Sequence, residues 1–123
     1  NGLLAAAVMG ARLYAAGDLT GAAQALGFAS LLTSYQPDEW ALADAVAQLL
    51  AAAGRPAQAT DIYRALFAAK NLPAELRLAW LPHAVAAAQS AHDSAQASTW
   101  SAALADLTPA PSPPPATPTA GKK

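Results

Sequence analysis

Two histidines are the side chains of this chain best suited to metal or acid–base chemistry, but their spacing does not suit a shared metal site. His83 and His92 are nine positions apart, whereas two ligands on one helix face need a spacing of three or four residues. We therefore expect both histidines to pack against helices or to cap them. The sequence has no cysteine, which excludes disulfides, thiol catalysis and thiolate metal sites.

Four serines near the end of the chain are the remaining candidate nucleophiles. They have no neighbouring base in a nucleophile-type motif, and only 12% of the residues are charged. An enzyme needs a polar pocket with perturbed ionisable groups, and the sequence offers none. We predict no catalytic residue, no metal site and no cofactor, and thus a protein that is not an enzyme. The serines are Ser90, Ser94, Ser98 and Ser101.

Two polar pairs have alternative interpretations. Asp44 and Gln48 are four residues apart, so on a helix they share one face. They either contact the backbone of a ligand or form part of a solvated face, and both readings remain open. Asp38 and Glu39 precede an apolar helical pattern, and they are interpreted as a helix start stabilised by the helix dipole rather than as a catalytic acid pair.

The aromatic side chains divide between core and surface. Tyr63 and Phe67 are four residues apart and are expected in the core, while Trp40 opens a helix. Tyr14 and Trp80 are the best candidates for ligand contact, with packing between repeats as the alternative reading of both.

These side chains must be positioned by helices, because the chain contains two copies of a helical pattern. Gly17 and Gly54 are 37 positions apart, and each lies between two segments rich in alanine and leucine. Apolar residues recur in these segments at helical spacing, and the sequence lacks the alternation of strands. Each unit therefore reads as helix, glycine turn and helix. Ala22 and Ala59 fall at equivalent places in the second helices, where a short side chain allows close crossing.

A third unit is expected after Pro73, which can open a helix. Pro82 should kink that helix or split it into 74–80 and 83–92. A break is expected at 92–94, followed by a last helix with an apolar stripe of Trp100, Ala103, Leu104 and Leu107. The prediction is an all-α stack of antiparallel helical hairpins with five or six helices over residues 1–107. Residues 108–123 form a proline-rich tail that we expect to be disordered.

Charge and hydropathy exclude two further classes of partner. The formal net charge is −1 without a basic cluster, which argues against nucleic acid. The apolar run at the start is about half the length of a membrane span and lacks a basic flank, so we expect a structural helix there. Although 54% of the residues are hydrophobic, many are alanine, and the core should be thin.

The 37-residue period is close to that of tetratricopeptide (TPR) hairpins, and the segment 13–70 carries a closer likeness. Its repeated pattern of glycine, a polar residue, three spacers and alanine resembles the small TPR-like chaperones of bacterial type III secretion systems. The resemblance implies a cytoplasmic bacterial protein without catalysis, whose partner is another polypeptide, a secreted subunit or translocator, held in a concave groove. Carried over, the groove residues are Leu4, Ala7, Ala11, Tyr14, Ala41, Asp44, Gln48 and Ala51, which Trp80 would join.

A second function class fits the same pattern. Bacterial regulatory and assembly proteins contain similar repeats, so the chain can also be read as a TPR-like scaffold segment of a larger protein. An upstream domain in the full reading frame would favour this alternative over the chaperone.

Overall fold

The computed structural model describes residues 2–108, which are helical throughout apart from turns and short connections, with no strand in that range. The all-α prediction is confirmed. The α-helices are α1 (Gly2–Ala15), α2 (Leu19–Gly27), α3 (Trp40–Ala52), α4 (Pro56–Phe67), α5 (Ala74–Ser90) and α6 (Ser94–Leu107), and the 3-10 helices are η1 (Phe28–Leu31) and η2 (Pro37–Glu39).

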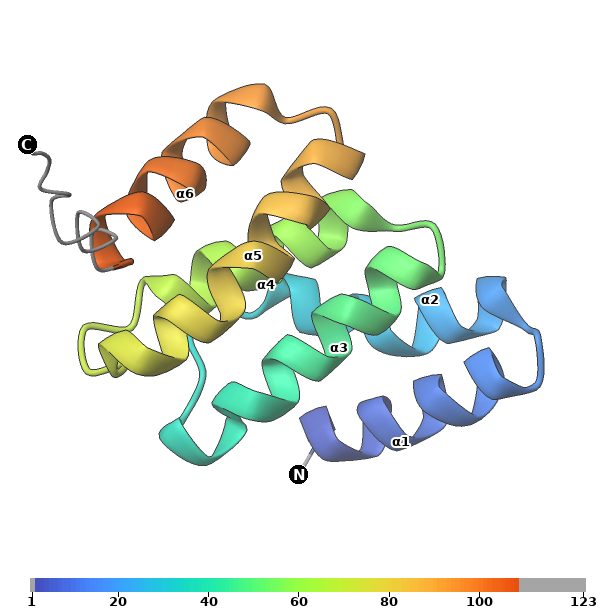
Figure 1. Ribbon diagram of the computed structural model, residues 1–123. Coiled ribbons are helices and arrows are strands. Elements are labelled where there is room, and N and C mark those ends of the chain that lie inside the picture. The colour runs from blue at the N-terminus through green and yellow to red at the C-terminus, as the bar shows by residue number, and fades with distance from the viewer. Residues whose placement is uncertain (1, 109–123) are drawn as a thin grey trace, which may run out of the picture.

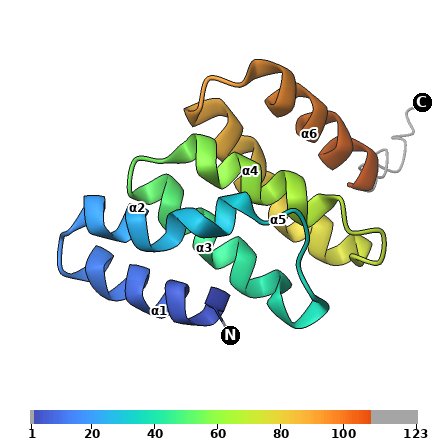
Figure 2. The same ribbon diagram turned by 180° about the vertical axis from the view of Figure 1, so that it is seen from behind.

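Consecutive helices pair as three antiparallel hairpins, α1 with α2, α3 with α4, and α5 with α6. The hairpins stack so that α1, α3 and α5 follow one another in one layer, with α2 and α4 behind them (Figure 1). Seen from the other side, α2 and α4 lie in front of α3 and α5 (Figure 2). The first helices of the hairpins therefore share one side of the molecule.

The three hairpins bend in the same way. Gly17 and Gly54 have φ values of 86° and 87°, and each ends its helix with the two backbone hydrogen bonds of a Schellman motif. The prediction that these glycines mark equivalent bends is confirmed. The third bend is at His92, with φ 60° and the same pair of bonds. It follows Gly54 by 38 positions, so the break expected at 92–94 is a third copy of the same turn.

Small residues set how closely the helices of a hairpin cross. Ala22 and Ala59 are both fully buried, as their repeated alanine predicted. A Cβ on Gly10 would overlap the side chain of Leu26, so α1 and α2 touch there with no room for a methyl group. In the second hairpin Ala47 takes the place of Gly10 and Tyr63 that of Leu26.

The core runs between the two layers and continues under α6. Among its largest fully buried side chains are Tyr63, Leu26, Leu50, Ile62, Leu66 and Leu81. Phe67 stacks on Tyr63 and meets Trp100 of α6 edge to face, with ring centroids 5.7 Å apart. Such aromatic pairs add to the free energy gained by burial alone. The predicted core role of Tyr63 and Phe67 is confirmed, with Phe67 only partly buried.

One of the two outcomes predicted at Pro82, a split helix, is corrected. The helix over Pro82 is not split at 80–83, because α5 runs unbroken from Ala74 to Ser90. Proline removes one backbone donor, but Leu81 and Ala84 beside it are buried at 1% and 0% exposure, and this packing keeps the residues on both sides of Pro82 in one helix. In the first unit, α2 ends at Gly27 and the chain continues as η1.

The last helix, α6, exposes polar residues at positions where the equivalent residues of α4 are buried. At the places of Thr60 and Tyr63, which are 1% exposed on α4, α6 carries the exposed residues Ser98 and Ser101. Thr108 ends α6 by donating its hydroxyl to the carbonyl of Leu104 at 2.7 Å. The tail predicted for 108–123 lies, from residue 109 on, outside the described residues.

Candidate partner-binding surface

The residues predicted to line a groove all lie on α1, α3 and α5, the helices that share one layer (Figure 1). We call their outward side the α1–α3–α5 face. Leu4 and Tyr14 are 51% and 37% exposed there, whereas Ala7 and Asp44 are buried. Ala11, Ala41 and Gln48 are exposed, and Ala51 and Trp80 are partly buried. Their contact with a partner stays a prediction.

Asp44 joins three helices by hydrogen bonds. Its Oδ1 accepts a 2.7 Å hydrogen bond from the hydroxyl of Tyr63 on α4, and its Oδ2 accepts one of 2.8 Å from Nε2 of Gln48 on α3. Nδ1 of His83 on α5 lies 3.1 Å from the same Oδ1. A buried carboxylate is stable only when hydrogen bonds replace its hydration. Of the polar pair seen in the sequence, Asp44 is therefore buried at this junction, while Gln48 contacts it from an exposed position.

Burial and the neighbouring carboxylate both act on Tyr63. Desolvation raises the pKa of its hydroxyl far above the ordinary tyrosine value, and the hydrogen bond to Asp44 and the charge of that residue raise it further. Tyr63 therefore remains a proton donor over the whole physiological range. The donor fixes Asp44 in place below the α1–α3–α5 face.

The two histidines have separate structural roles. The side chain of His83 is 41% exposed and contacts Asp44 from the α1–α3–α5 face, while His92 forms the last bend. The packing or capping role expected for both agrees with these positions. Among residues 2–108, no group of three or more His, Asp or Glu side chains is placed to hold a metal ion.

The repeat register gives the positions in α5 that are equivalent to the predicted groove positions of α3, which the sequence analysis did not name. A shift of 38 residues, set by the bends at Gly54 and His92, carries the α3 series 41, 44, 48 and 51 onto Ala79, Pro82, Ala86 and Gln89, which are all exposed. The same shift puts Trp80 at the place of Leu42, and both pack partly against the core. The tripeptide Ala-Gln-Ala at 57–59 and 95–97 has this spacing, but a third copy at 23–25 does not fit the register, so the tripeptide alone could not have fixed it.

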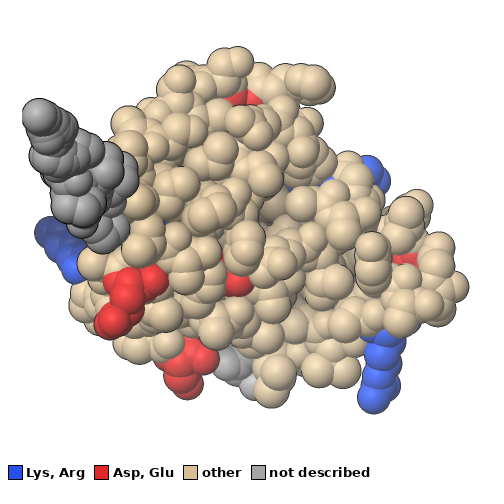
Figure 3. Space-filling model, viewed as in Figure 1, with Lys and Arg blue, Asp and Glu red and all other residues tan. Residues whose placement is uncertain are grey.

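The α1–α3–α5 face is largely uncharged. Figure 3 shows charged side chains mostly along its rim, with one small acidic area near the centre. Its exposed positions include four alanines, and the larger exposed groups on it are Leu4, Tyr14, Gln48, Pro82, His83 and Gln89. A surface of this kind supplies apolar contact with a few hydrogen-bonding groups, which suits a polypeptide better than a charged ligand.

Two hollows are present, and no groove residue predicted from the sequence lines either of them, although Gln89, one of the α5 positions that the register adds, borders the first. The first, of about 420 Å³, brings Ser94, Ser98 and Ser101 near His92. No hydrogen bond joins His92 to these serines within residues 2–108, so the geometry shows no activated nucleophile. The other hollow lies between α2, η1 and the start of α4.

Comparison with known proteins gives no relative: no family model, no curated protein and no solved structure matches the chain. Over residues 2–108, none of the helices combines the length and the apolar character needed to cross a membrane. The function therefore has to be argued from the surface itself.

Proposed function

We propose that this chain is a non-catalytic protein-binding module that holds a segment of another polypeptide on the α1–α3–α5 face. One observation carries the proposal. Three equivalent hairpins place their first helices, α1, α3 and α5, side by side, and every exposed residue at the equivalent groove positions is uncharged, with alanine at four of them. Exposed alanines such as Ala11, Ala41 and Ala86 leave the helix backbones open to close approach.

The physical basis of binding is burial of apolar surface with a few directing contacts. Apolar area removed from water contributes roughly 25 cal/mol per Å² before the cost of ordering the segment. Gln48 and His83 flank the buried Asp44 and present hydrogen-bonding groups to a peptide backbone. Binding of this kind needs no cofactor, and it would shield an assembly-prone partner from association with itself.

The finer form of the proposal is a bacterial type III secretion chaperone acting in the cytoplasm. It is supported by the sequence resemblance over 13–70 and by the agreement of the hairpin bends with that pattern. The partner would then be a secreted subunit or translocator kept soluble before export. Capture from the source organism distinguishes this form, because the bound polypeptides would include a secreted protein.

The test of the proposed face adds bulk without removing core. Ala11→Arg and Ala41→Arg obstruct exposed positions, and Ala102→Arg on exposed α6 serves as the matched control. Polypeptides captured from a lysate would be identified by mass spectrometry and their binding then measured directly. We expect both face variants to lose binding while the control and the helical circular dichroism are unchanged. Equal binding by all three variants would overturn the proposal.

The aromatic candidates are tested by Tyr14→Ala combined with Trp80→Ala. Loss of binding with retained helicity assigns them to the ligand contact. Global unfolding would assign them to packing instead, and it would leave the arginine variants to decide the proposal. Leu19→Ala, which truncates an exposed leucine on α2, is the control for general loss of surface apolar area.

The alternative, a TPR-like scaffold segment of a larger bacterial regulatory or assembly protein, is favoured by one observation. Met9 is 52% exposed, while its equivalents Val46 and Ala84 are 0% exposed under the preceding hairpin. Because a hairpin covers this position in α3 and α5, the exposed Met9 leaves a place on α1 where a further hairpin could pack. An antibody to the chain, used on a lysate of the source organism, separates the two functions. A band at the mass of the 123-residue chain favours the chaperone, and a much larger band favours the scaffold.

A further inference from the structure

The hollow between α2, η1 and α4 lies on the side of the stack seen in Figure 2, away from the α1–α3–α5 face. Its volume is about 440 Å³, which is in the range of small-ligand pockets. None of its lining residues is acidic. They are Ala23, Gln24, Gly27, Phe28, Ser30, Leu31, Arg55 and Gln58.

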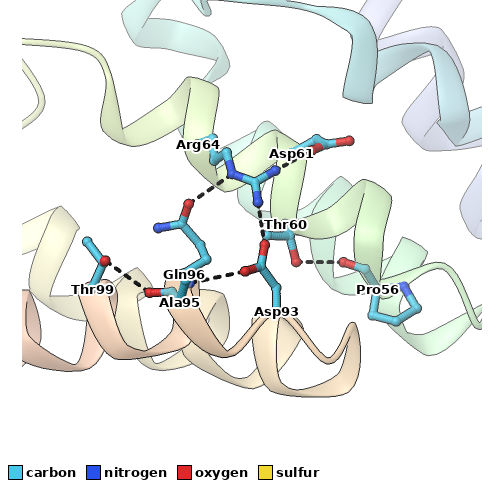
Figure 4. Close-up of polar contacts among 8 residues, drawn as sticks. All are labelled: Pro56, Thr60, Asp61, Arg64, Asp93, Ala95, Gln96 and Thr99. Atoms are coloured by element: carbon cyan, nitrogen blue, oxygen red, sulfur yellow. Dashed lines mark hydrogen bonds and ion pairs between the residues drawn. The ribbon is translucent and has the colours of Figure 1, made fainter.

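The equivalent place one hairpin further on is filled by a side chain. Arg64 of α4 reaches across to α6, where its guanidinium bonds to Asp93 at 2.5 Å and to Oε1 of Gln96 at 2.9 Å (Figure 4). It also bonds to Asp61 on its own helix at 2.6 Å. These contacts tie the second helices of adjacent hairpins together.

The repeat register shows what replaces this group in the hollow. Gly27 stands 37 positions before Arg64, and Gln58 and Arg55 stand 38 positions before Gln96 and Asp93. In the hollow, Gly27 therefore has no side chain where Arg64 fills the equivalent place. The carboxamide of Gln58 matches that of Gln96, and the cation of Arg55 stands where Asp93 has a carboxylate. A Cβ on Gly27 would meet only Nε2 of Gln58, at 3.5 Å, so the space above this residue is open.

An unpaired acceptor remains beside the open space. Oε1 of Gln58 is buried without a hydrogen-bond partner, whereas Oε1 of its equivalent Gln96 accepts from Arg64. A buried acceptor left unpaired has lost the hydrogen bonds that it makes with water in the unfolded chain. The hollow thus has no donor in the place that Arg64 takes in its counterpart. Nε2 of Gln58 is the atom beside Gly27, so the carboxamide would turn to let its oxygen accept from an N–H of a bound group.

We propose that this hollow is a second binding site, for a polypeptide segment that carries a carboxylate next to an apolar side chain. Arg55 would pair with the carboxylate, since no acidic side chain lines the hollow. Phe28 and Leu31, which are 39% and 80% exposed, offer an apolar flank. A backbone N–H of the segment would donate to Gln58. The proposal does not depend on the α1–α3–α5 face.

The experiment uses labelled peptides and the isotope-labelled full chain. The peptides place leucine or phenylalanine one to four positions from a glutamate, on a glycine–serine background, and the control set carries lysine in place of glutamate. We expect the acidic set alone to bind and to shift the amide resonances of residues 23–31 and 55–58. Absence of such shifts with every acidic peptide overturns the proposal.

Matched variants sharpen the result. Gly27→Arg combined with Arg55→Asp rebuilds in the hollow the guanidinium contacts seen around Arg64, and should weaken acidic-peptide binding by at least about tenfold while keeping the melting temperature. Arg55→Asp alone should reverse the preference towards the lysine set, and Leu31→Ser should weaken binding without unfolding. Unchanged affinity in Arg55→Asp or Leu31→Ser refutes the site.

Two controls separate this site from the proposed function. Arg12→Asp makes the same charge change on α1, no residue of which lines the hollow, and should leave peptide binding intact. Ala41→Arg obstructs the α1–α3–α5 face and should also leave it intact. Loss of acidic-peptide binding in Ala41→Arg would place the peptide on that face and overturn the second site.

Discussion

The hydroxyl of Tyr63 donates a 2.7 Å hydrogen bond to the carboxylate of Asp44, across the α3–α4 hairpin. Tyr63 is 1% exposed and Asp44 is 7% exposed, so the bond forms away from bulk water. It connects the aromatic core to the only buried carboxylate among the described residues, directly below the proposed binding face. The stability of that face is therefore tied to a single core hydroxyl.

Tyr63→Phe should lower the free energy of unfolding by about 1–3 kcal/mol, because the buried carboxylate of Asp44 loses its shortest hydrogen bond. Urea denaturation followed by circular dichroism measures the change. Tyr14→Phe is the control, since its exposed hydroxyl should alter stability by less than about 0.5 kcal/mol. Equal stabilities for Tyr63→Phe and the native chain would mean that the bond contributes nothing net.

Stability should fall in alkaline solution because buried tyrosines keep their protons in the folded state. Burial, helped by the charge of Glu39, raises the pKa of Tyr35 to about 12, and the pKa of Tyr63 is also raised. Unfolded tyrosines lose the proton near pH 10, so above that pH the folded state binds more protons than the unfolded state. The stabilisation is complete below pH 10 and is lost as the pH rises through about 12.

Urea denaturation at several pH values between 9 and about 12 tests this dependence. Tyr35→Phe should lose part of the slope, although it also removes the 2.9 Å bond from the Tyr35 hydroxyl to the carbonyl of Ala29. The slope is therefore the informative quantity, and not the absolute stability. A stability independent of pH above 10 would contradict the prediction.

His92→Gly should stabilise the chain by about 0.5–1 kcal/mol, because a left-handed backbone strains a residue with a Cβ. Gly54→Ala is the opposite change at an equivalent bend and should destabilise by about 1–2 kcal/mol. A Cβ at Gly54 would meet no atom within 4 Å, so that effect arises from the backbone alone. Thermal melts of both variants measure the pair, and shifts of the same sign would contradict the equivalence of the bends.

Gly10→Ala should destabilise the chain by about 1–3 kcal/mol through overpacking against Leu26. Adding Leu26→Ala makes room for the new methyl group, so the double variant should lose less than the sum of the two single changes. Gly2→Ala is the control, because its Cβ would lie 3.9 Å from Phe28, an ordinary contact. Strict additivity of Gly10→Ala and Leu26→Ala would show that the helices do not cross where the structure has them.

The hairpin bends could be predicted where glycine marked them. Gly17 and Gly54 could be recognised as bends because glycine adopts a positive φ without strain. The helices on either side of each bend could then be located. The third bend was located only as a break, because histidine at 92 carries no such signal, and without it the register of α5 could not be set. The register places Trp80 at the position of Leu42, between the predicted groove positions, and its contact with a partner stays a prediction.

Burial of Asp44 could not be predicted from local sequence. An aspartate four residues from a glutamine is typical of an exposed helix face, and its two further partners lie 19 and 39 positions away. Their contact depends on how three helices pack. The same reason kept the hollow beside Gly27 hidden, since it appears only when two hairpins are superposed through their bends.

Ser98 and Ser101 make the outer side of α6 less suited than the edge of α1 to packing against a further hairpin. Where α4 offers its successor a buried threonine and tyrosine, α6 offers hydroxyls that prefer water, so a further layer laid on that side would have to desolvate them. Growth by duplication of hairpins is thus disfavoured after α6 and permitted ahead of α1, where Met9 stands uncovered. An engineer who wished to lengthen this array could splice new hairpins onto its first end unchanged, but would have to rewrite both serines at the last.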